Sequence, residues 1–209
     1  MSSVDPVRSP ERPRRVALVL ARYSAGGGTP PGIDRDTFAR TCLADTYEVL
    51  ADLVGVTAGI VGPAETQDLL WGDGLWRPDQ PVLTLAASLA ADFDELVCVT
   101  ADVPDLPGLV LAKMFKVLHR VDLTFAPARN GPGCAAVGLA LPAAAWVPEP
   151  DLDASRDALV AAAPSRNRCV LSPDWHRLQT AEAVNRLDPR LEGWEETRAL
   201  LSGHPLAGV

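Results

Sequence analysis

Two aspartates, Asp102 and Asp105, follow an apolar run at residues 96–99. Pro104 and Pro107 restrict the direction in which the chain leaves that run. Asp and Pro are common turn residues, so the pattern fits an ordinary turn at the end of a strand. It also fits a metal site, because open α/β proteins bind ligands at the carboxyl ends of their strands and Mg²⁺ prefers carboxylate and phosphate oxygens. The pattern alone leaves both interpretations open.

A glycine-rich loop at residues 21–33 follows a second apolar strand candidate at 16–20 and precedes a predicted helix. Backbone N–H groups in such a loop can bind phosphate. The loop has neither the G-x-G-x-x-G pattern of dinucleotide sites nor the Gly-Lys-Ser/Thr of a P-loop, so a flexible loop is the alternative. The candidate phosphate-binding residues are Gly26, Gly27, Gly28, Arg22 and Arg35.

Ser172, Asp174 and His176 lie close together in the chain, but they predict a polar turn. A hydrolytic triad is assembled from separate parts of a chain, and no G-x-S-x-G turn is present. The sequence therefore identifies no catalytic residue.

Composition narrows the class of protein. The chain has 209 residues, a formal charge of −8 and a pI near 4.8, which argues against nucleic-acid or anionic-membrane binding. The apolar run after Arg15 ends at Arg22, too soon for a secretory signal or a membrane span. Four dispersed cysteines predict buried thiols in a reducing compartment, so we expect a cytoplasmic protein. Abundant Arg, Ala, Gly and Pro indicate a bacterial genome of high GC content.

The order of apolar runs predicts an α/β fold. Strand and helix patterns alternate in the first half, which favours a parallel sheet with right-handed crossovers, and the stretch after residue 129 predicts a mixed sheet. We expect a disordered tail at 1–13 and one Rossmann-like domain at 14–209. Strands are expected at 16–20, 56–62, 96–101, 121–128, 133–141 and 168–173, and helices at 34–53, 64–70, 82–93, 107–119, 179–187 and 190–202, with loop at 71–81.

The segment VCVTADVPDLP, residues 97–107, resembles the GT-A-type nucleotide-diphospho-sugar transferase superfamily. The closer resemblance is to an uncharacterised bacterial family of predicted glycosyltransferases related to 2-phospho-lactate guanylyltransferases, with weaker matches at 38–53, 122–139 and 175–187. This resemblance implies a GT-A-like fold in which Asp102, with Asp105 as a helper, holds Mg²⁺ or Mn²⁺ against nucleotide phosphates.

Several family features are absent. GGGTPPG replaces the family's Lys-Thr-Arg phosphate grip, and Asn130 begins the segment where Asp-Gly-Gly-Tyr is expected. Asn is a weaker metal ligand than a carboxylate, so Asn130 is a candidate cofactor contact only. Two functions therefore stay open. One is a nucleotidyltransferase or glycosyltransferase that binds a nucleoside triphosphate or nucleotide sugar with a divalent metal. The other is a degenerate, non-catalytic relative that binds a nucleotide or acts as a partner subunit.

Overall fold

The computed structural model describes residues 13–154 and 156–203, so the predicted tail lies outside the described residues except for Pro13. The described residues form a seven-stranded sheet in the order β3-β2-β1-β4-β6-β5-β7. Its strands are β1 (Arg15–Leu20), β2 (Val56–Val61), β3 (Leu75–Arg77), β4 (Glu95–Thr100), β5 (Leu123–Pro127), β6 (Cys134–Ala140) and β7 (Cys169–Leu171). The predicted α/β fold with one mostly parallel, mixed sheet is confirmed.

The middle of the sheet consists of strands that are apolar on both faces. β1 pairs in parallel with β2 on one side and with β4 on the other. Both β1 and β4 are almost fully buried, as expected for continuous apolar runs in a parallel sheet covered by helices. Their carboxyl ends therefore meet at one edge of the sheet, which we call the carboxyl edge.

β6 is the strand that makes the sheet mixed, since it runs antiparallel to both β4 and β5. β5 is consequently parallel to β4 and β1, as the sequence predicts. Because β6 is reversed, the segment at 128–133 that leads into it lies at the carboxyl edge. This places Asn130 on the same side of the sheet as Asp102.

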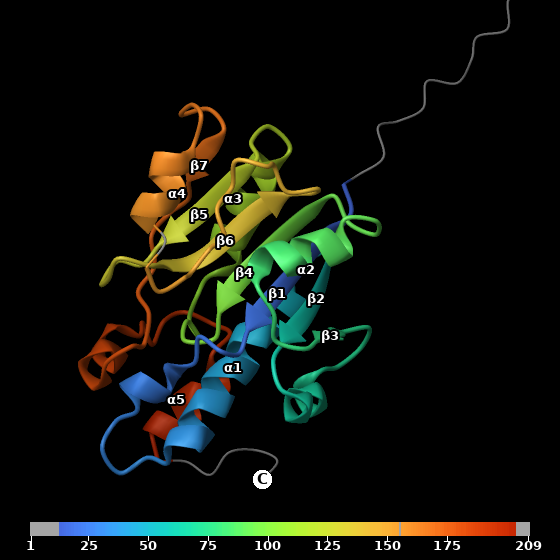
Figure 1. Ribbon diagram of the computed structural model, residues 1–209. Coiled ribbons are helices and arrows are strands. Elements are labelled where there is room, and N and C mark those ends of the chain that lie inside the picture. Colours follow the sequence, from blue (N-terminus) through green and yellow to red (C-terminus); the bar gives the residue numbers. More distant parts are fainter. Residues whose placement is uncertain (1–12, 155, 204–209) are drawn as a thin grey trace, which may run out of the picture.

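Helices cover both faces of the sheet (Figure 1). Apolar residues of α1 and α3 pack on one face, and those of α2 and α4 pack on the other. Asp34 caps α1, where its carboxylate accepts a hydrogen bond from the backbone N–H of Thr37. The helices are α1 (Arg35–Ala51), α2 (Val82–Leu89), α3 (Gly108–Leu118), α4 (Arg156–Ala162) and α5 (Glu195–Leu201), with 3₁₀ turns η1 (Ala25–Gly28), η2 (Ala64–Leu69) and η3 (Ala181–Arg186).

A third apolar cluster attaches residues 175–201, which we call the C-terminal segment, to the glycine-rich loop. Leu178 and Trp194 pack with Ala25 and Phe38 in this cluster. α5 lies beside α1 in Figure 1, and the carboxylate of Asp45 on α1 accepts hydrogen bonds from the first turn of α5. The C-terminal segment thus passes over the carboxyl edge of β1 and β4.

Several predicted elements are corrected. The predicted loop at 71–81 contains β3, which pairs with β2 at the edge of the sheet, a long-range contact that local pattern cannot reveal. The predicted helices at 64–70 and 179–187 are 3₁₀ turns, α2 ends at Leu89 instead of 93, and α4 is a helix that the sequence analysis did not predict.

The sequence also predicts buried cysteine thiols and an apolar run too short to span a membrane. All four cysteines are buried and free. Across the described ranges, no helix is long and apolar enough to cross a membrane.

Candidate functional site

Asp102 lies just beyond the carboxyl end of β4, as predicted, but it does not face an open cleft. The residue is 0% exposed. Its two carboxylate oxygens accept hydrogen bonds from Nε of Arg177, at 2.9 and 3.0 Å. Burial raises the pKa of Asp102, and the guanidinium of Arg177 opposes that rise. A segment 75 residues further along the chain covers this carboxylate.

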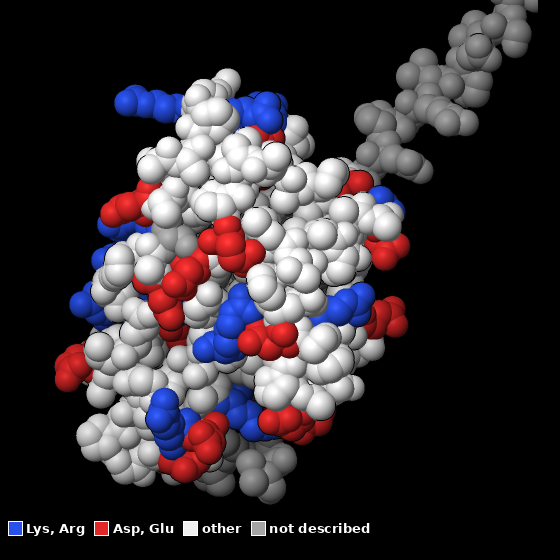
Figure 2. Space-filling view, viewed as in Figure 1, with Lys and Arg blue, Asp and Glu red and all other residues white. Residues whose placement is uncertain are grey.

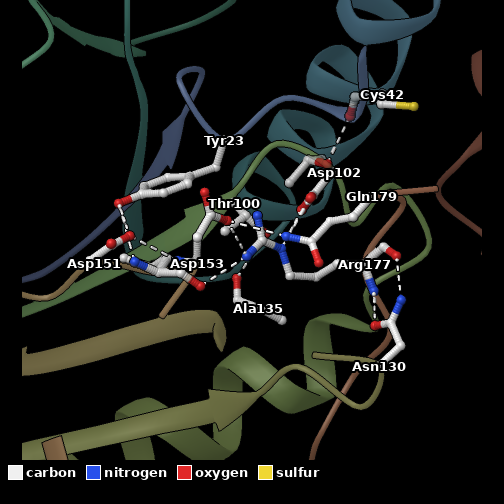
Figure 3. A network of polar contacts seen from close by, with 12 residues as sticks. Tyr23, Cys42, Thr100, Asp102, Asn130, Ala135, Asp151, Asp153, Arg177 and Gln179 are labelled. Atoms are coloured by element: carbon white, nitrogen blue, oxygen red, sulfur yellow. Dashed lines mark hydrogen bonds and ion pairs between the residues drawn. The ribbon is translucent and has the colours of Figure 1, made fainter. Parts of the chain in front are cut away.

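Arg177 is the centre of this polar network (Figure 3). Besides Asp102, its Nη1 contacts the carbonyl oxygen of Leu152 at 2.9 Å and a carboxylate oxygen of Asp153 at 2.8 Å. The guanidinium also lies over the ring of Tyr23, 5.7 Å from its centroid. Burial lowers the pKa of Arg177, but the charges of Asp102 and Asp153 outweigh this and raise it. The guanidinium therefore keeps its positive charge although the residue is only 1% exposed.

Asp105 is also buried and also faces the C-terminal segment. Its Oδ1 accepts a hydrogen bond from the indole N–H of Trp175 at 3.0 Å. Its Oδ2 lies 3.2 Å from Nε2 of His176, without the geometry of a hydrogen bond. The ring of Trp175 stacks on that of His176. Asp105 thus helps to fix residues 175–177 next to the end of β4.

These surroundings do not fit the divalent metal that the sequence predicts. Both oxygens of Asp102 bond to Arg177, and both oxygens of Asp105 face the side chains of Trp175 and His176. Within 13–154 and 156–203, no group of three or more His, Cys, Asp or Glu side chains is placed to hold a metal. A metal ion could bind the carboxylate of Asp102 only if the side chain of Arg177 moved away from it.

The glycine-rich loop contacts protein backbone where phosphate was expected. A Cβ on Gly28 would lie 2.2 Å from the carbonyl oxygen of Leu178, and one on Gly27 would lie 3.1 Å from that of Gln179. Glycine is required here because the C-terminal segment approaches so closely. Gly26 is likewise buried, against the side chain of Arg35. The contact of Gly28 with the backbone therefore accounts for that glycine without a bound phosphate.

Asn130 contacts Arg177 directly. Its side-chain amide donates to the carbonyl oxygen of Arg177 at 3.0 Å and accepts from the backbone N–H of Arg177 at 3.1 Å. Asn130 therefore holds the backbone of the arginine that bonds Asp102. Its contacts are to protein, and it positions Arg177.

An open pocket lies beside this covered region, at the carboxyl ends of β1 and β2. Its volume is about 410 Å³. Arg22 is the one predicted site residue that lines it, and its guanidinium is paired with Asp79. A second arginine of the pocket, Arg40, pairs with Asp68. We call this the strand-end pocket; it is lined by Ala21, Arg22, Ser24, Ala39, Arg40, Leu43, Gly62, Pro63, Thr66 and Asp79.

The sequence predicts a polar turn at 172–176, and the side chains of this cluster do not form a triad. Ser172 bonds to Thr124, Asp174 pairs with Arg129, and His176 faces Asp105. Each polar group of this cluster has a separate neighbour, so the cluster holds no hydrolytic arrangement.

Sequence reasoning did not identify Arg177. The segment at 175–187 is noted as a family match, but nothing local distinguishes this arginine from the other basic residues of the chain. A buried arginine needs a carboxylate partner, but the neighbours His176 and Leu178 do not reveal from the sequence that Arg177 is buried. Asp102 and Asp105 are the carboxylates that follow a fully buried strand.

Comparison with known proteins gives structural matches only; no family model and no curated protein sequence matches the chain. A protein of Desulfovibrio desulfuricans G20, assigned as a nucleotide-diphospho-sugar transferase, has a TM-score of 0.63 and 17% identity. The match covers 92% of this chain and 99% of that one. The 4-diphosphocytidyl-2C-methyl-D-erythritol synthase of Anaerococcus prevotii has a TM-score of 0.55 and 10% identity, covering 90% and 95%. At these identities the likeness establishes the fold alone: the chain shares the α/β fold of these two proteins.

Proposed function

We propose that this chain is a nucleotide-binding protein without metal-dependent transferase activity. The pair of Asp102 and Arg177 is the observation that carries the proposal, because the carboxylate predicted as a metal ligand is already bonded to a cation of the chain itself. The nucleotidyltransferase-like fold supports a nucleotide as the class of ligand. Of the two functions that the sequence leaves open, the geometry therefore favours the non-catalytic relative.

The strand-end pocket is the proposed binding site. It lies at the carboxyl edge, where open α/β sheets bind ligands, and its volume of about 410 Å³ suits a small organic molecule. Ala21 and Leu43 provide apolar surface for a base or sugar ring. Arg22, Ser24 and Asp79 provide hydrogen-bond donors and acceptors for its polar edges.

Charge favours ligands with few phosphates. Arg22 and Arg40, the two basic residues of the pocket, are each paired with an aspartate. On the face that Figure 2 draws, basic and acidic side chains lie next to one another rather than in a patch of one sign. The chain as a whole carries a charge of −8. Without a metal, a triphosphate meets little net positive charge, so we expect nucleoside monophosphates and nucleotide sugars to bind more tightly than triphosphates.

Calorimetry on the full chain tests this function. Nucleoside monophosphates, nucleotide sugars and triphosphates are titrated in EDTA and again in Mn²⁺. We expect binding of the less charged ligands to be equal in both buffers. Arg22→Ala should weaken it about tenfold, the effect of losing a charge-assisted hydrogen bond. Arg190→Ala is the matched control, because Arg190 pairs with Asp188 outside the pocket.

Two results contradict the proposal. Binding that requires Mn²⁺ and is lost in Asp102→Asn indicates the metal-dependent transferase instead. The absence of binding by every nucleotide tested contradicts a nucleotide ligand and leaves the partner subunit as the remaining alternative.

A further inference from the structure

We infer that an apolar pocket between α4 and β7 binds a small amphipathic acid, with the apolar part of the ligand inside the pocket and its carboxylate at Arg166. The inference goes beyond the proposed function and does not depend on nucleotide binding. The strand-end pocket lies at β1 and β2, whereas β7 is the border strand on the other side of the sheet.

The pocket is a separate cavity of the size that small ligands use. In Figure 1, α4 lies beside β7, at the opposite end of the molecule from α1 and α5. The volume of the pocket is about 510 Å³, within the range of roughly 300–1,000 Å³ that is typical of small-molecule sites. Its lining consists of Val160, Ala163, Ser165, Arg166, Cys169, Val170 and Leu171.

Most of this lining is apolar. Val160 is 50% exposed and Leu171 is 57% exposed, so both side chains have apolar surface that a ligand can cover. Cys169 is buried and belongs, with Leu159 of α4, to the apolar cluster on this face of the sheet. Burial raises the pKa of the Cys169 thiol, so the thiol adds no charge at neutral pH. The walls therefore suit an alkyl chain or an apolar ring.

Arg166 is the charged residue of the lining, and its charge is not neutralised by the protein. Among the described residues, its guanidinium has no hydrogen bond and no ion pair. Arg168, two residues further along the chain, is instead paired with Asp122. A guanidinium presents a fork of N–H donors that matches the two oxygens of a carboxylate. The free charge of Arg166 therefore favours an anionic head group over a neutral or cationic one.

Local hydrogen bonds fix the turn that carries Arg166. The backbone N–H of Arg168 donates to the carbonyl oxygen of Ser165 at 3.1 Å. The hydroxyl of Ser165 bonds to the side chain of Asn167. Since the backbone on both sides of Arg166 is held, little ordering of the chain is needed when a ligand binds.

Nuclear magnetic resonance on the ¹⁵N-labelled full chain tests the inference with three probes that share one alkyl chain: octanoate, 1-octanol and octylamine. We expect octanoate to shift the backbone N–H signals of Cys169, Val170 and Leu171. It should bind about tenfold more tightly than 1-octanol, the effect of one charge-assisted hydrogen bond. Octylamine should bind most weakly, because its ammonium group is repelled by Arg166.

Arg166→Ala should weaken octanoate about tenfold and leave 1-octanol unchanged, so that the two probes bind equally. Arg168→Ala is the matched control. It removes the same charge two residues away from a residue that is already paired and does not line the pocket, so octanoate affinity should change by less than about twofold. Leu171→Ala should weaken octanoate and 1-octanol alike, and the fold should tolerate it because Leu171 is exposed.

Four results overturn the inference. They are the absence of octanoate-induced shifts on β7, equal affinities of the wild type for octanoate and 1-octanol, equal losses in Arg166→Ala and Arg168→Ala, and a dimer in sedimentation velocity that dissociates in Leu171→Ala. The last result would mean that a second copy of the chain covers the pocket. Nucleotides should leave the β7 signals unchanged, so failure of the proposed function would be recognised independently.

Discussion

Two of the aspartate–arginine pairs at the carboxyl edge of the sheet differ mainly in burial. In the pair of Asp102 and Arg177 the side chains are 1% and 2% exposed. In the pair of Asp79 and Arg22 they are 50% and 25% exposed. The same two residue types therefore serve different purposes. The buried pair fixes the C-terminal segment over the end of β4, whereas the exposed pair lines an open pocket where a ligand can replace either partner.

Asp102→Asn tests the buried pair and should have the largest effect on stability. It leaves the buried guanidinium without its main carboxylate, which should lower the free energy of unfolding by about 3–5 kcal/mol. Urea unfolding of wild type and variant measures the difference. A loss below about 1 kcal/mol would place the buried pair with ordinary surface pairs and would reopen Asp102 as a metal ligand.

Asp45 is a third buried aspartate, and its carboxylate accepts from the backbone N–H groups of Glu196 and Thr197 instead of pairing with an arginine. Burial raises its pKa to about 7 from an ordinary 3.8. The folded chain therefore holds a proton that the unfolded chain releases. This contribution to stability is complete below pH 3.8 and is lost as the pH rises through about 7.

We expect the free energy of unfolding of the wild type to fall by about 2–4 kcal/mol from pH 4 to pH 8 through this group. Asp45→Asn should remove that part of the pH dependence. The nearby Glu48, Glu195 and Glu196 stay unchanged in the variant, so the difference between the two pH profiles reports Asp45. Parallel profiles would show that Asp45 is ionised in the folded chain at pH 4.

Gly28→Ala tests whether the glycine-rich loop belongs to the buried region. Its Cβ would lie 2.2 Å from the carbonyl oxygen of Leu178, and we expect a loss of about 1–3 kcal/mol from the resulting shift. Gly131→Ala is the control, since its Cβ would have its nearest neighbour, in the side chain of Gln179, at 3.5 Å. Equal unfolding free energies for the two variants would indicate that the loop stands away from the C-terminal segment.

Asp79→Asn should have the smallest effect on stability, below about 1 kcal/mol, because exposed ion pairs contribute little. It leaves the charge of Arg22 without its partner aspartate, so triphosphates should bind more tightly to the variant than to the wild type. Calorimetry in EDTA measures this gain. Unchanged triphosphate affinity would argue that Arg22 does not contact the phosphates.

Much of the fold could be predicted because apolar runs report burial directly. The runs at 16–20 and 96–99 are strands buried on both faces, and the helix predicted at 34–53 is α1, which Asp34 caps. β3 could not be predicted, since a three-residue edge strand depends on its pairing with β2 more than on its own sequence.

For the candidate site, the sequence predicted where Asp102 lies but not which side chains surround it. Asp102 does follow the central strand, but its neighbours come from a segment 75 residues away, and no local pattern tells which side chain will reach it. A carboxylate after a buried strand predicts a cation nearby. Whether that cation is a metal ion or an arginine depends on long-range packing. The same limit applies to Gly28, whose need for glycine comes from the backbone of Leu178 and not from its own loop.

The sheet ends on both sides in strands of only three residues, β3 and β7. An outer strand exposes unpaired N–H and carbonyl groups, and a long one can pair with the edge of another molecule and start aggregation. Here each outer strand offers very few such groups. The chain can therefore keep long apolar strands in its interior while presenting little template for intermolecular β-pairing at either border.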